Sequence, residues 1–86
     1  MPNIVSYLGL AFYIYFNDHN PPHVHIHYGE FKLVIAIEGA ELMEGYLPKR
    51  QRKLAQAVIS KYKEEFQEKW ELAQTGHQPG KIEVRL

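Results

Sequence analysis

Four of the five histidines in this 86-residue chain lie close together near its N-terminus, at His19, His23, His25 and His27. The last three alternate with apolar residues, a pattern that is typical of one face of a β-strand. Residues two apart on a strand lie about 6.7 Å from each other on the same face. Two imidazoles at this spacing can converge on one ion with metal–nitrogen distances of about 2.0–2.1 Å. The spacing therefore predicts a metal site.

The loop before this strand can supply the remaining ligands. Two consecutive prolines, Pro21 and Pro22, make it rigid, and it can bring His19 against His23 and His25 as a third nitrogen ligand. A nearby carboxylate would add an oxygen, and such a ligand set with an open position suits zinc or another divalent first-row metal. The candidate ligands are thus four histidines and one acid: His19, His23, His25 and His27, with Asp18 or Glu38.

The histidines have two other interpretations. They can be partly exposed side chains that form hydrogen bonds on a solvated sheet face. They can also act without a metal, with His19, His23 and His25 as candidate catalytic residues in phosphodiester hydrolysis. The string His23–Tyr28 matches the alternation of the histidine-triad hydrolases, in which the middle histidine attacks a nucleotide α-phosphate. Here the string lies early in the chain and covers six residues, so we interpret it as local convergence.

Basic residues are concentrated in the second part of the chain. Ten Lys and Arg balance ten Asp and Glu, yet residues 1–31 contain no Lys or Arg. Four cations fall at the start of an expected helix: Lys49, Arg50, Arg52 and Lys53. Positive charge at the start of a helix interacts unfavourably with the helix dipole, at a cost of about 0.3–1 kcal/mol per residue. Free backbone N–H groups and cations at the same place can, however, bind phosphate or nucleic acid. A solvated turn paired with Glu41 and Glu44, or a surface for an acidic protein partner, are the alternatives.

Alternating residues predict the sheet that positions the histidines. Strands are expected at Ala11–Phe16, His23–Tyr28 and Phe31–Glu38, with Gly29 and Glu30 forming a type II′ hairpin turn between the last two. This turn sets three apolar cross-strand pairs: Tyr28 with Phe31, Ile26 with Leu33, and Val24 with Ile35. A slip of one residue would mix apolar with polar side chains. The three histidines are then expected on the outer face, together with Tyr13 and Tyr15. Further short strands are expected in Ile4–Leu10, Ala40–Tyr46 and Lys81–Leu86.

A single helix is expected from Pro48 to about Thr75, with Gly76 ending it. An apolar stripe recurs every fourth residue, at Leu54, Val58, Tyr62, Phe66 and Trp70. A straight helix of this length spans about 42 Å, against about 30 Å for a globule of this size. The helix therefore either breaks near Ser60 or projects, and projection would favour a homo-oligomer.

Length and composition predict one soluble domain. A chain of 10.1 kDa buries about two-thirds of its unfolded surface, enough for one small core. With no cysteine, disulfides and thiolate metal sites are excluded. No apolar run approaches the roughly 20 residues of a membrane span, and Met-Pro-Asn does not resemble a signal peptide, so a cytoplasmic location without membrane contact is expected. The predicted fold is α+β: a small antiparallel sheet of three to five strands (1–47), one long helix packed on its apolar face (48–75) and a tail (76–86).

Five strings spread along the chain carry a family resemblance: Asp18–His25 (DHNPPHVH), Tyr28–Phe31 (YGEF), Glu44–Arg50 (EGYLPKR), Trp70–Ala73 (WELA) and Lys81–Glu83 (KIE). Together they resemble a bacterial family of small proteins catalogued as domain of unknown function 4160. The resemblance implies a compact sheet with one long helix and no established activity. It also implies a small partner protein encoded nearby, as in a toxin–antitoxin-like pair. His19, His23 and His25 belong to the family pattern, whereas His27 does not.

Two functions from different classes follow. The first is a small interaction module that acts with a partner protein in a toxin–antitoxin-like or regulatory pair, through the basic helix start and an exposed sheet edge. The second is a metal- or histidine-dependent phosphodiester hydrolase that uses His19, His23 and His25. The metal content of the purified protein distinguishes between them.

Overall fold

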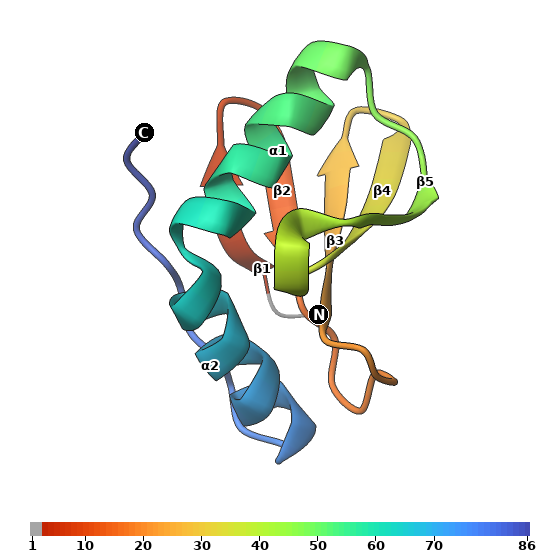
Figure 1. Ribbon diagram of the computed structural model, residues 1–86. Helices are drawn as coiled ribbons and strands as arrows, with labels where there is room; N and C mark the ends of the chain where they lie inside the picture. Colours follow the sequence, from red (N-terminus) through yellow and green to blue (C-terminus); the bar gives the residue numbers. More distant parts are fainter. Residues whose placement is uncertain (1–2) are drawn as a thin grey trace.

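The computed structural model describes residues 3–86 and has the predicted α+β fold (Figure 1). Five strands precede two helices: β1 (Asn3–Tyr7), β2 (Leu10–Tyr13), β3 (His23–Tyr28), β4 (Phe31–Ala36), β5 (Leu42–Gly45), α1 (Lys49–Lys61) and α2 (Lys63–Gln74). A short 3₁₀ turn, Glu38–Ala40, joins β4 to β5. Within the described residues, no helix is both long and apolar enough to cross a membrane.

The strands form one antiparallel sheet in sequence order, from β1 to β5. The predicted β3–β4 register is confirmed, since Tyr28 pairs with Phe31 and every following pair is the expected one back to His23 with Ala36. Gly29 has a φ of 56°, the left-handed value that the first position of a type II′ turn requires. Period-two alternation and a two-residue turn are local features, and together they fix this register.

One face of the sheet carries the core. The predicted inward residues of β3 and β4, Val24, Ile26, Leu33 and Ile35, are at most 2% exposed. The same buried cluster contains Val58 of α1 and Phe66 of α2. The ring centroids of Phe12 and Phe66 are 6.0 Å apart. Figure 1 shows α1 crossing this side of the sheet, with α2 extending toward the loop between β2 and β3.

The helix is in two pieces and not one long helix, because it breaks at Tyr62, close to Ser60, where the length of the predicted helix suggested a break. Tyr62 has φ −110° and ψ 29°, outside the helical region, and it separates α1 from α2. The longest dimension of the molecule is 33 Å, shorter than the roughly 42 Å of a straight helix over this stretch. The break also places Glu64 and Glu65 in the first turn of α2, where acidic residues suit the helix dipole.

The C-terminal tail does not form the expected edge strand. The Ile82 amide donates one hydrogen bond of 3.0 Å to the Ile4 carbonyl beside β1, but residues 77–86 have no strand assignment. The tail is instead held against the helix break. Tyr62 Oη lies 2.8 Å from the Arg85 amide nitrogen and 3.1 Å from its carbonyl oxygen.

Candidate metal centre

Two histidines of β3 and one aspartate of the preceding loop meet at the end of the sheet. One carboxylate oxygen, Asp18 Oδ2, lies 2.8 Å from His23 Nε2 and 3.0 Å from His25 Nε2. The three potential ligand atoms all lie within 4.8 Å of one another. Because residues two apart on a strand share a face, β3 presents both imidazoles to the same carboxylate. Two histidines and one carboxylate are a ligand set that suits a divalent first-row metal.

The burial of His23 differs from the expected outward position of all three histidines. His23 is 2% exposed, and its ring centroid lies 5.1 Å from that of Trp70. It stands at the first position of β3, where α2 and the β2–β3 loop close over the end of the sheet. Its Nδ1 lies 2.7 Å from the Pro21 carbonyl oxygen, which can only accept a hydrogen bond. An N–H at Nδ1 therefore leaves Nε2 as the nitrogen whose lone pair can face a metal.

Asp18 is held in place from three directions. Its Oδ1 accepts a hydrogen bond of 3.0 Å from the His19 amide, while Oδ2 meets His23 and His25. From α2, the Gln74 side-chain amide donates to the Asp18 backbone carbonyl at 2.9 Å. Burial raises the pKa of Asp18, but the hydrogen bonds from His25 and the His19 amide, together with His23, outweigh it and lower the pKa below its ordinary value. The carboxylate is therefore ionised at neutral pH, as a metal ligand must be.

The other two candidate histidines lie outside this set. His19 is largely exposed, and its Nδ1 lies 3.2 Å from Asp18 Oδ1, whereas His23 and His25 contact the other oxygen, Oδ2. His27 packs against Tyr13 in a tilted arrangement, with ring centroids 4.7 Å apart. Burial, followed by the charges of Lys32 and His25, lowers the pKa of His27 and favours its neutral form. Glu38, the alternative acid, lies elsewhere and pairs with Lys63 at 2.8 Å.

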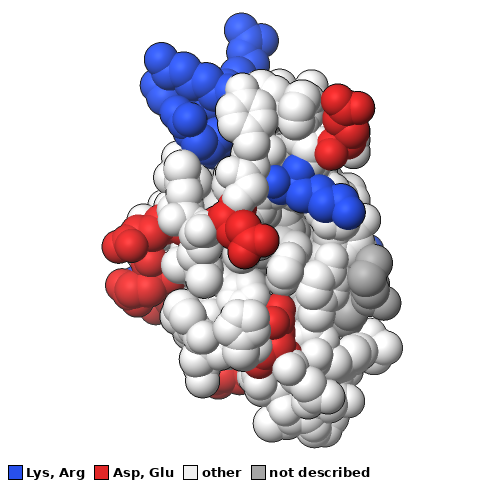
Figure 2. Space-filling model, turned by 90° about the vertical axis from the view of Figure 1, so that its right-hand side faces the viewer, with Lys and Arg blue, Asp and Glu red and all other residues white. Residues whose placement is uncertain are grey.

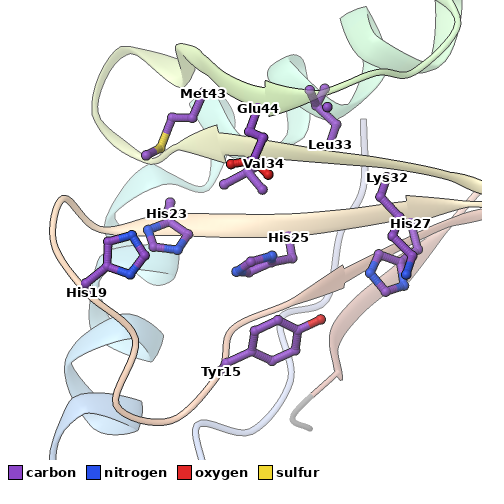
Figure 3. Close-up of a pocket in the computed structure, with 11 residues that line it drawn as sticks. Tyr15, His19, His23, His25, His27, Lys32, Leu33, Val34, Met43 and Glu44 are labelled. Carbon is purple, nitrogen blue, oxygen red and sulfur yellow. The ribbon is translucent and has the colours of Figure 1, made fainter.

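Two members of the cluster, His23 and His25, line a pocket of about 400 Å³ on the histidine face of the sheet (Figure 3). His19 and His23 lie at one end of this pocket, His25 at its centre, and His27 with Lys32 at the other end. Glu44 of β5 and Tyr15 line opposite sides. Lys32 and Glu44 were not among the sequence candidates for this site. The hairpin register alone places Lys32 beside His27, whereas Glu44 becomes a neighbour only through the pairing of β5 with β4.

The four basic candidates lie apart from this cluster, at the start of α1. Figure 2 shows Lys and Arg side chains gathered at the end of the molecule where α1 begins. Three of the four are exposed and Arg52 is half-buried. The expected pairing with Glu41 and Glu44 is not found, since none of the four cations forms an ion pair within the described part of the chain.

The structure thus defines a small α+β domain with a two-histidine, one-carboxylate cluster at the end of an antiparallel sheet. The family model "Domain of unknown function (DUF4160)" matches residues 9–71, well over half of the chain. The chain belongs to this family, as the resemblance indicated, and the match includes both the cluster and the basic start of α1. No curated protein and no solved structure gives a significant match.

Proposed function

We propose that this protein binds a divalent first-row metal, zinc being the best fit, and uses it to hydrolyse phosphodiesters. The observation that carries the proposal is the convergence of Asp18, His23 and His25 beside a pocket that the two histidines line. Both nitrogens of His23 face acceptor oxygens, the Pro21 carbonyl and Asp18 Oδ2. A neutral imidazole has only one N–H and can donate to only one of them. A metal ion bound between His23 Nε2 and Asp18 Oδ2 would bring these two atoms together without a proton on Nε2, so the buried imidazole would carry only the proton on Nδ1.

The chemistry of such a centre follows from its three protein ligands. A zinc ion held by Asp18, His23 and His25 would keep a position open for water and would lower the pKa of that water to about 7. The resulting hydroxide would attack the phosphorus atom and the P–O bond to the leaving group would break. The products are a phosphate monoester and an alcohol, so one water is consumed. The ionised Asp18 would reduce the net charge of the centre, and the buried His23 would limit access of solvent from one side.

Metal content tests this proposal. We expect untagged protein to bind about one equivalent of zinc per chain, measured by mass spectrometry and calorimetric titration. The variant His25→Ala should lose affinity by more than about 100-fold, since even the partners of metal ligands contribute 10–100-fold. His27→Ala is the matched control, because it removes the same side chain from the same face of β3 but lies outside the cluster. A wild-type protein that binds less than about a tenth of an equivalent would contradict a metal function.

A second function, binding of a partner macromolecule, is supported by the four cations at the start of α1, which form no ion pair among residues 3–86. Phosphates of a nucleic acid, or carboxylates of a small partner protein, would complement this charge. In this interpretation the protein is one half of a regulatory pair, and the basic cluster is the contact surface. The metal centre and the basic cluster lie on different elements, so the two functions can be tested independently.

Charge reversal tests the second function. The double variant Arg50→Glu/Arg52→Glu should raise the stability of α1 by a few tenths of a kcal/mol per residue, because the new charges suit the helix dipole. The same variant should lose salt-sensitive binding to RNA oligonucleotides, measured by fluorescence anisotropy at two salt concentrations. Equal binding by wild type and variant would exclude the basic cluster as a nucleic-acid contact.

A further inference from the structure

Lys32 stands at the end of the histidine face that is remote from the metal ligands. It pairs with His27 across the β3–β4 hairpin, so both side chains project from the same face. Figure 3 shows the two side by side at one end of the pocket, with His19 and His23 at the other. The Lys32 side chain is exposed and forms no ion pair with any residue in 3–86. The end of the pocket opposite the proposed metal ligands therefore carries a positive charge.

The distance between His25 and His27 along β3 indicates how far the Lys32 ammonium lies from a group bound at the metal ligands. His27, the partner of Lys32, lies two residues beyond the ligand His25, which is about 6.7 Å along the strand. Consecutive phosphates of an extended nucleic-acid strand are separated by about the same distance. The one acid opposite, Glu44, is paired with Val34 and so lies level with His25, nearer to the metal end. Its negative charge does not neutralise the Lys32 end of the pocket.

We propose that Lys32 binds the phosphate next to the scissile one, so that the substrate class of this site is a single-stranded nucleic acid. The inference rests on the proposed function in assigning the cleaved phosphodiester to Asp18, His23 and His25. The Lys32 ammonium donates hydrogen bonds to the neighbouring phosphate and sets the position of the strand along the pocket. A simple diester with no second phosphate would occupy the metal end alone.

Binding of two dinucleotides tests this assignment. We expect the wild-type protein to bind the 5′-phosphorylated thymidine dinucleotide about five-fold more tightly than the same dinucleotide without that phosphate, which is the upper end of the range for an exposed charge pair. Lys32→Ala should remove this preference and Lys32→Arg should keep it. Lys81→Ala is the control, because it changes the net charge equally and Lys81, which contacts Asn3, lies outside the pocket. Affinities are measured by calorimetry or NMR titration with zinc present and with zinc absent.

The outcomes distinguish this inference from the proposed function. Equal affinity for the two dinucleotides, or an equal loss in Lys32→Ala and Lys81→Ala, would overturn the role of Lys32 even if zinc is bound. A wild type that binds neither dinucleotide would also overturn it. Failure to bind zinc would refute the metal centre alone, because the preference for the extra phosphate can still be measured without metal. A preference that only Lys32→Ala abolishes supports the substrate class.

Discussion

The variant Phe66→Ala is expected to lower the free energy of unfolding by about 3–5 kcal/mol, as large-to-small substitutions of buried aromatic residues do. Phe66 is fully buried in α2 and lies against Phe12 of β2. Removing its ring leaves a cavity between helix and sheet that the surrounding side chains fill only in part. Urea denaturation followed by circular dichroism gives this quantity. A loss of this size is a large fraction of the total stability of a small domain.

Phe16→Ala is the matched control for this experiment. It deletes the same side chain, but Phe16 is 38% exposed and lies in the loop after β2. We expect its cost to be well below that of Phe66→Ala, because exposed positions lose little apolar burial. Similar costs for the two variants would show that α2 does not close the core of this protein.

The second large effect is expected at Gly45, the last residue of β5. Its φ is 94°, and a Cβ at this position would lie 2.2 Å from the Lys32 carbonyl oxygen. That carbonyl accepts a hydrogen bond of 2.8 Å from the Tyr46 amide, so it cannot move without loss of the contact. We expect Gly45→Ala to cost about 3 kcal/mol or more, since 1–2 kcal/mol of backbone strain adds to a disrupted β4–β5 pairing.

Gly29→Ala separates backbone strain from steric overlap. Gly29 also has a positive φ, 56°, but a Cβ there would meet no atom within 4 Å. Its cost should therefore stay within about 1–2 kcal/mol, and the difference between the two variants measures the clash at Lys32. If Gly45→Ala is no more destabilising than Gly29→Ala, β5 does not pair with β4 in the described register. The position of Glu44 in the pocket would then be wrong as well.

The Gly45 and Phe66 variants also affect the candidate site. The pocket and the cover over His23 depend on the same strand pairing and helix packing that these two residues maintain. Gly45 lines the pocket, and the backbone of Lys32 is its nearest neighbour. Phe66 lies in the same helix as Trp70, which covers His23. Loss of the β4–β5 pairing is thus expected to weaken dinucleotide binding. Loss of the α2 packing is expected to weaken zinc binding, because the cover over His23 and Asp18 comes from α2.

Local features of the sequence are sufficient to specify the hairpin and its two faces. Side chains alternate across a strand with a period of two, and a two-residue turn leaves one register in which apolar residues meet. For this reason Ile26 opposite Leu33, and Lys32 beside His27, could be predicted without knowing any distant contact. The family assignment also followed from short strings of sequence, and the match over residues 9–71 confirms it.

The position of the helix break and the set of residues that meet at the site depend on contacts between distant segments. The apolar stripe continues through Tyr62, so the periodicity of the sequence does not indicate the break there. A break was expected only because a straight helix over this stretch would be longer than the whole molecule. Asp18, rather than Glu38, reaches the histidines because Gln74, which is 56 residues away in the sequence, holds the Asp18 loop through a hydrogen bond. Trp70 of the same helix buries His23. Strand pairing is decided between near neighbours. The ligand set instead depends on contacts between distant segments, which local periodicity does not encode.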